Sequence, residues 1–266
     1  MSQRLVQVDA FTSKPFAGNP AAVCVLSGPG EERFMQDVAR EMNLSETAFV
    51  HAEGDAWRLR WFTPAMEVDL CGHATLAAAH FLWEDGHLPA TAEARFDTRS
   101  GRLTARRAGE WIEMDFPSEP PVAGEVPEEL RCALRVARDG DVSYAGKNRM
   151  DYLLELRSAD HVRALRPDFT LLRTVPTRGV IVAARSDHRD YDFISRFFAP
   201  AAGVDEDPVT GSAHCCLAPY WAEKLGKAQL TGYQASARGG VVRAGARGPR
   251  VILGGQAVTV FEGTLR

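Results

Sequence analysis

Two stretches of the chain, far apart in the sequence, repeat one local pattern. An aromatic pair, then threonine or alanine, then proline and alanine, occurs at Trp61–Ala65 and again at Phe197–Ala201. Each stretch leads through an acidic loop to a glycine, Gly72 or Gly211, that opens an alanine-rich segment. Repetition at this spacing indicates two similar lobes; the alternative is a coincidence between two short strings.

The remaining segments predict a mixture of strands and helices. Glu31–Met42 predicts an amphipathic helix, because Phe34, Val38 and Met42 share one face and acidic residues lie near its start. Ala74–Glu84, rich in alanine and leucine, predicts a buried helix. Apolar runs predict strands at 5–8, 21–26, 47–50, 57–62, 152–156 and 179–184, with a hairpin at 103–106 and 111–116.

The lobes are expected to meet at a linker. Segment 116–127 contains four prolines and is the best candidate for it. We therefore expect an N-terminal lobe at 1–117, completed by a C-terminal strand at 256–266, and a C-terminal lobe at 128–255. If the lobes are related by pseudo-symmetry, the two glycine-opened helices can both point their N-termini into one cleft. A helix N-terminus exposes unpaired amide groups and holds anions, so a small carboxylate suits such a site.

Composition excludes several other classes of protein. With 45% hydrophobic and 25% charged residues the chain is of ordinary globular type, and 31 basic against 35 acidic residues leave no positive excess for binding nucleic acid. No apolar run approaches the roughly 18 residues that a membrane span needs. The N-terminus does not resemble a signal peptide, and five scattered cysteines fit a reducing compartment. We expect a cytoplasmic protein.

Three segments carry residues suited to acid–base chemistry. Glu46 follows a predicted helix and opens a predicted strand, where burial can raise the pKa of a carboxyl group toward the working pH. Pro208 restricts Asp207 to an extended conformation, and Ser212 places a hydroxyl beside the second helix N-terminus. His73 can donate to a substrate or relay a proton. Each has a plain alternative as a solvated or purely structural residue.

The sequence gives little support for a cofactor. No P-loop motif is present, nor a dinucleotide-binding glycine motif after a strand. The spacing of the cysteines and histidines around the two glycine-opened helices does not match a structural zinc site, so we expect no metal. These residues are Cys71, His73, His214, Cys215 and Cys216. Cys71 can be a reactive thiolate at a helix N-terminus.

A set of five motifs resembles the phenazine-biosynthesis isomerase family across nearly the whole chain and in the same order. The motifs are Asp9–Thr12, Phe16–Pro20, Asn43–Thr47, Cys71–Thr75 and Asp207–Ala213. The family shares its fold with diaminopimelate epimerase and proline racemase. The resemblance therefore implies an α+β fold of two pseudo-symmetric lobes, each a barrel-like β-sheet wrapped around a central helix, with the active site between them.

The resemblance also implies a reaction and a set of site residues. The family's glutamate, which moves a proton on trans-2,3-dihydro-3-hydroxyanthranilate without a cofactor, matches Glu46. Its supporting histidine and aspartate match His73 and Asp207. The substrate-binding positions match Asn19, Ser45, Gly72, Gly211 and Ser212. A homodimer is expected from the resemblance alone.

The cysteines separate two branches of this fold. Racemases and epimerases use two opposed thiols, and Cys71 occupies the place of the first. The second would fall near Val209, where there is no thiol, so a single glutamate is the better candidate for the acid–base group, with Cys71 auxiliary. A small carboxylated, cyclic metabolite is the expected substrate class. The alternatives are a thiol-dependent epimerase using Cys71 and a non-catalytic ligand-binding or interaction protein.

Overall fold

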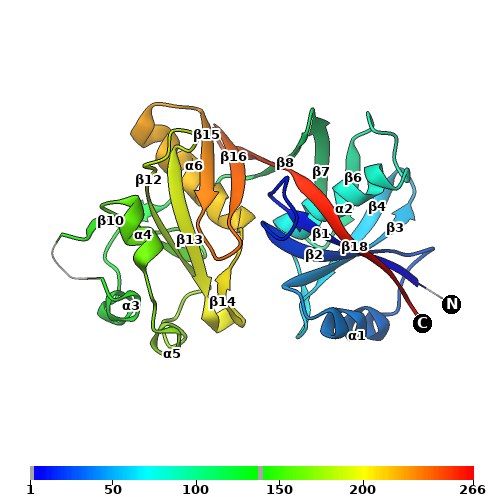
Figure 1. Cartoon of the computed structure of the whole chain (residues 1–266), viewed down its shortest axis with the longest axis horizontal. Helices are drawn as coiled ribbons and strands as arrows, with labels where there is room; N and C mark the ends of the chain where they lie inside the picture. The colour runs from blue at the N-terminus through cyan, green and yellow to red at the C-terminus, as the bar shows by residue number, and fades with distance from the viewer. Residues whose placement is uncertain (1–2, 137–139) are drawn as a thin grey trace. The chain divides into compact units, whose positions relative to one another are not determined.

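The computed structural model describes residues 3–136 and 140–266 and divides the chain into two compact units. The first unit is Met1–Asp115 together with Gly254–Arg266, and the second is Phe116–Leu253. The last strand of the chain thus belongs to the first unit, where it pairs antiparallel with the first strand. Figure 1 follows this return by colour, from blue strand β1 to red strand β18.

The first unit is built on a mixed sheet around one buried helix (Figure 1). Its helices are α1 (Glu32–Met42) and α2 (Gly72–Glu84). Its strands are β1 (Gln3–Ala10), β2 (Asn19–Val25), β3 (Glu46–Glu53), β4 (Ala56–Phe62), β5 (Glu67–Val68), β6 (Ala94–Thr98), β7 (Gly101–Ala108), β8 (Trp111–Pro117, which runs into the second unit) and β18 (Ala257–Leu265). Helix α2 is apolar on nearly every face and contacts β1, β2, β3 and β18, so it fills the core that these strands enclose.

The second unit has the same kind of core around helix α6. Its helices are α3 (Glu128–Leu134), α4 (Ala159–Ala164), α5 (Phe169–Leu172), the 3₁₀ turn η1 (Pro200–Ala202) and α6 (Gly211–Leu225). Its strands are β9 (Val122–Ala123), β10 (Val142–Lys147), β11 (Asp151–Leu156), β12 (Gly179–Arg185), β13 (Phe193–Ala199), β14 (Val204–Asp207), β15 (Gln229–Gln234), β16 (Gly240–Arg247) and β17 (Arg250–Gly255). Trp221, on α6, is fully buried and stacks on Phe193 of β13.

Strand pairing confirms the internal repeat. In the first unit β1 and β2 pair antiparallel, β2 and β3 parallel, β3 and β4 antiparallel, and β4 then pairs antiparallel with β5 and parallel with β6. The second unit repeats this series with β10, β11, β12, β13, β14 and β15. In both units the buried helix, α2 or α6, lies between the last two strands of the series in chain order. The two glycine-opened helices are therefore equivalent elements of the repeat.

Two sequence predictions need correction. The apolar face of α1 is formed by Met35, Val38 and Ala39, whereas Phe34 is 38% exposed, because the buried stripe follows positions three and four apart starting from Met35. The acidic stretch before α6 is not a loop, since Val204–Asp207 is strand β14. No helix within the described ranges combines the length and apolar character needed to cross a bilayer.

Candidate functional site

Helix α2 and strand β3 bring four of the expected site residues together in the first unit. Strand β3 begins at Glu46, which lies beside Ala21 in the parallel pairing with β2. Helix α2 begins at Gly72, directly after its N-cap residue Cys71. Asn19 is the first residue of β2. Because β2 and β3 run parallel, their first residues reach the same end of the sheet.

The imidazole of His73 is the centre of this cluster. Its Nε2 lies 3.3 Å from Oε2 of Glu46. On the other side of the ring, Nδ1 lies 3.2 Å from Nδ2 of Asn19 and 3.5 Å from Sγ of Cys71. The contact with Glu46 is an approach within ion-pair distance whose angle departs from that of a hydrogen bond. Glu46, His73, Cys71 and Asn19 thus form one connected group, which we call the α2 cluster.

Burial differs sharply across the α2 cluster. Asn19 is fully buried and the side chain of His73 is only 5% exposed, while the side chain of Glu46 is 19% exposed. Burial lowers the pKa of His73 from 6.5 to about 3, so its ring is neutral at physiological pH. Glu46 is therefore the member of the cluster that a small molecule can reach.

The N-terminus of α2 adds hydrogen-bond donors at the same place. Cys71 is in an extended conformation, and its side chain makes no capping hydrogen bond to the helix. Since the first amide groups of an α-helix have no intrahelical acceptor, the amides of this first turn can donate to an anion. The carboxylate of Glu46 and these amides can then act on one ligand, the first as a base and the second as donors.

The α2 cluster also contains three residue types that bind transition metals. One ligand atom from each of Glu46, Cys71 and His73 lies within 4.8 Å of the others. However, Glu46 approaches Nε2 of the imidazole while Cys71 approaches Nδ1, on a different side of the ring. One ion binds a single ring nitrogen, so this arrangement fits an imidazole placed between two side chains better than it fits a metal ligand set.

In the second unit, Asp207 ends β14 and lies three residues before the N-cap of α6. The hydroxyl of Thr210, that N-cap residue, donates to the carboxylate of Asp207. The fully buried Gln234 donates to the backbone carbonyl of Asp207 at 2.7 Å and accepts from the amide of Thr210 at 2.9 Å. Asp205 and Glu206 face arginines instead, Arg173 and Arg196. Of the three acidic residues, only Asp207 is directed to the start of α6.

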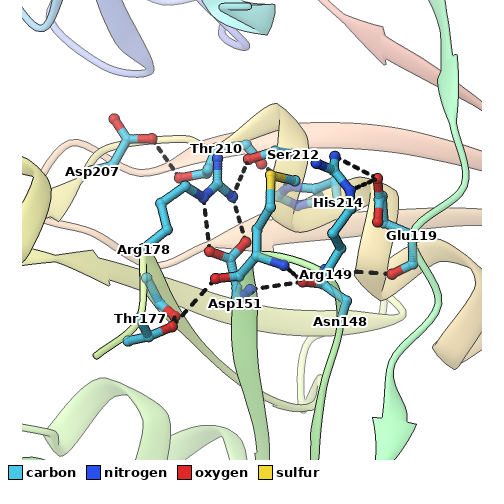
Figure 2. A network of polar contacts seen from close by, with 12 residues as sticks. Glu119, Asn148, Arg149, Asp151, Thr177, Arg178, Asp207, Thr210, Ser212 and His214 are labelled. Carbon is cyan, nitrogen blue, oxygen red and sulfur yellow. Dashed lines mark hydrogen bonds and ion pairs between the residues drawn. The ribbon is translucent and has the colours of Figure 1, made fainter. Parts of the chain in front are cut away.

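An ion pair between a partly exposed arginine and a buried aspartate supports the first turn of α6. Figure 2 shows the guanidinium of Arg178 between the carboxylate of Asp151 and the hydroxyl of Ser212. Arg178 donates to both oxygens of Asp151 and, at 2.9 Å, to Ser212 Oγ. Gly211 is the first helical residue and is buried. The hydroxyl of Ser212 therefore accepts a hydrogen bond from Arg178, whose guanidinium is held in place by the carboxylate of Asp151.

The structure thus sorts the expected site residues into two groups. Glu46, His73, Cys71 and Asn19 lie together, with Ser45 and Gly72 next to them in the chain. Asp207, Gly211 and Ser212 lie in the second unit at the start of α6. Arg178, Asp151 and Gln234 were missed, because they reach α6 from strands or loops 24 to 61 positions away in the sequence, and no local motif marks them.

The thiols of α6 do not complete a second acid–base pair. Cys215 and Cys216 are buried, and burial raises the pKa of both thiols to about 12. Val209, which precedes the helix, is fully buried and apolar. A thiol partner for Cys71 is therefore not provided by these positions.

Comparison with known proteins places the duplicated fold in a class. A probable proline racemase from Agrobacterium radiobacter K84 has a similar structure, with a TM-score of 0.63 over 99% of this chain and 93% of the other, at 13% sequence identity. The chain thus has the α+β fold of racemases and epimerases. The model of the phenazine biosynthesis-like protein family matches residues 8–263, and the chain belongs to that family.

Closer relatives agree with this assignment. A protein named as an isomerase in Halalkalibacterium halodurans is 54% identical over 266 residues, covering 100% of this chain and 99% of the relative. A crystal structure of a phenazine biosynthesis family protein from Enterococcus faecalis has a TM-score of 0.94 at 40% identity and full coverage of both chains. The family to which these relatives belong comprises isomerase- and epimerase-like proteins.

Proposed function

We propose that the protein is an isomerase that shifts a proton on a small, cyclic, carboxylated metabolite, with Glu46 as the single general acid and base. The observation that carries the proposal is the contact of 3.3 Å between the partly exposed carboxylate of Glu46 and the buried, neutral imidazole of His73. A carboxylate that is accessible on one side and held on the other has the placement that a general base requires.

The proposed reaction balances without a co-reactant. The Glu46 carboxylate takes a proton from a carbon of the substrate, so a C–H bond breaks, an O–H bond forms, and the electron pair enters the conjugated system. Glu46 then returns the proton to a second carbon. The negative charge that develops between the two steps needs hydrogen-bond donors, which the first-turn amides of α2 can supply. No electron acceptor or donor takes part.

The expected substrate class follows from the same group. Helix amides without a side-chain cap from Cys71 favour an anion, whereas the cyclic nature of the substrate stays a prediction. Asp207, Gly211 and Ser212 belong to the second unit, and their participation in this reaction stays a prediction. A dimeric state and a cytoplasmic location also stay predictions.

Proton NMR in D₂O tests the proposal. The substrates are trans-2,3-dihydro-3-hydroxyanthranilate, diaminopimelate and proline, and the variants are Glu46→Gln and, as a matched control, Glu53→Gln at the exposed end of the same strand. We expect isomerisation or uptake of solvent deuterium with the wild type and Glu53→Gln, and a loss of about 10²- to 10⁴-fold in Glu46→Gln. A folded, fully active Glu46→Gln variant would falsify the proposal.

One observation keeps a thiol-dependent epimerase as a second candidate. The Sγ atom of Cys71 lies 3.5 Å from Nδ1 of His73, so the thiol belongs to the same cluster. This candidate predicts that Cys71→Ser abolishes deuterium uptake on an amino acid such as diaminopimelate or proline. Under our proposal, Cys71→Ser stays active and Glu46→Gln does not. A third outcome, tight binding of a carboxylate with no exchange in any variant, would indicate a non-catalytic binding protein.

A further inference from the structure

The three neighbours of the His73 ring differ in what they can donate or accept. The Glu46 carboxylate, near Nε2, accepts hydrogen bonds when ionised. The Nδ2 atom of Asn19 carries two protons and can only donate, and it lies 3.2 Å from Nδ1 of the ring. The thiol of Cys71, on the same side, is both a weak donor and a weak acceptor, so it is compatible with either tautomer. The acceptor Glu46 and the donor Asn19 therefore lie at different nitrogens of one imidazole.

This distribution selects one form of the ring. A neutral imidazole has one N–H and one bare nitrogen, and the bare nitrogen accepts. With a donor at Nδ1 and a carboxylate near Nε2, the proton belongs on Nε2. The opposite tautomer would place N–H against the Asn19 amide protons and a lone pair against a carboxylate, which is unfavourable on both sides.

We propose that Asn19 is a positioning residue that fixes His73 as the Nε2–H tautomer, so that His73 presents an N–H, and not a lone pair, to the Glu46 carboxylate 3.3 Å away and does not relay protons. The proposal rests on the proposed function of Glu46 and replaces the expected role of Asn19 in substrate binding. Asn19 is fully buried, which suits a residue that acts through another side chain.

The surroundings of His73 also oppose the charged form of the ring. Burial lowers the pKa of His73 to about 3. His73 is the second residue of α2, where the positive end of the helix dipole disfavours an additional positive charge. A ring that stays neutral cannot pass on a second proton near neutral pH, but it can keep its one N–H on the nitrogen nearer to Glu46 before and after the carboxylate reacts.

A second histidine supplies an internal reference for testing the tautomer. His214 is fully buried, and its Nδ1 lies 2.8 Å from the carbonyl oxygen of Thr210. A carbonyl oxygen only accepts, so His214 must carry its proton on Nδ1. Burial lowers the pKa of His214 to about 4, so it too is neutral at pH 7. The two histidines are expected to be opposite tautomers in the same protein.

The experiment is long-range ¹H–¹⁵N NMR of ¹⁵N-histidine-labelled protein at pH 7. The spectra of His73→Gln and His214→Gln assign the two rings. We expect the Nε2–H pattern for His73 and the Nδ1–H pattern for His214. A Nδ1–H or doubly protonated His73 in the wild type overturns the proposal. This measurement needs no turnover, so its failure is distinct from the failure of the proposed function, which Glu46→Gln reports.

The Asn19→Asp variant links the tautomer to catalysis. An aspartate of the same shape accepts at Nδ1, which draws the proton to that nitrogen and favours the charged ring. We expect kcat to fall by between about 10-fold and 10⁴-fold. The upper limit is the loss of kcat that a wrong tautomer causes in enzymes whose general base is the histidine itself. The KM should change less than twofold, because Asn19 does not touch the substrate. A raised KM with unchanged kcat and unchanged tautomer would return Asn19 to substrate binding and refute the proposal.

Discussion

The carboxylate of Asp151 is fully buried and is bound through both of its oxygens by the guanidinium of Arg178 (Figure 2). Asp151 is the first residue of β11, and its backbone amide donates to Oδ1 of Asn148 at 2.7 Å. Arg178 is 38% exposed and extends the pair to Ser212. A buried charge is tolerated only when it is paired, so Arg178 stabilises β11 as well as the start of α6.

We therefore expect Arg178→Met to destabilise the protein strongly. Removing one partner of a buried ion pair costs about 3–5 kcal/mol, and the partial exposure of Arg178 reduces this to about 2–3 kcal/mol. The free energy of unfolding in urea at pH 7 measures the loss. The control is Arg149→Met, since Arg149 pairs with Glu119 but is 70% exposed and should cost less than about 1 kcal/mol. Equal losses in the two variants would mean that water replaces the guanidinium at Asp151.

Much of the architecture could be predicted from local sequence. The glycines at 72 and 211 mark the first residues of α2 and α6, and the run at 179–184 lies within the fully apolar part of β12. The hairpin at 103–106 and 111–116 is confirmed as β7 and β8. These elements could be predicted because the start of a helix and the course of a buried strand depend on residues that are neighbours in the sequence.

Other features depend on partners far along the chain. Strand β16 was not predicted, because its glycines and arginines give no apolar alternation, and its pairing with β15 defines it. The sequence around Glu206 predicts an acidic loop, whereas in the structure Glu206 lies in β14 and forms an ion pair with Arg196. In the site, Glu46 and His73 could be chosen from motifs, but the position of Asn19 at Nδ1 of the His73 ring follows only from the packing of α2 against β2.

The cysteines should differ widely in reactivity. Burial raises the pKa of Cys24, Cys215 and Cys216 to about 12, so at pH 7.5 fewer than about one molecule in 10⁴ carries a thiolate at any of these positions. Cys71 is 6% exposed, whereas Cys132 is exposed. We expect N-ethylmaleimide to add one label rapidly to the native protein, at Cys132, as measured by intact mass.

The Cys132→Ser variant is the control for this labelling, and it should take up no rapid label. In guanidinium chloride the wild type should take up five, one for each cysteine of the chain. A second rapid label that maps to Cys71 in the native protein would contradict the prediction. It would also strengthen the thiol-dependent epimerase as the alternative function.

The free energy of unfolding should fall as the pH is lowered below the pKa of an unperturbed histidine, about 6.5. The pKa of His214 is lowered by burial to about 4, against about 6.5 in an unfolded chain. Between these values the unfolded chain binds a proton that the folded protein does not, so the free energy of unfolding decreases as the pH falls. The loss is roughly 1 kcal/mol per pH unit for each such histidine between pH 6 and pH 4. His73 contributes in the same direction, with its window extending to about pH 3.

Comparing variants isolates the part that His214 plays. His214→Gln keeps a donor for the carbonyl of Thr210 but has no titrating group, so it should lose less stability than the wild type between pH 6.5 and pH 4.5 in urea unfolding. His161→Gln changes an exposed histidine on α4 and should follow the wild-type slope. All three proteins have the same carboxyl groups, so the contribution of these groups to the pH dependence cancels when the slopes are compared. If His214→Gln follows the wild-type slope as well, His214 takes up its proton in the folded protein, and the fully buried position found for its ring is wrong.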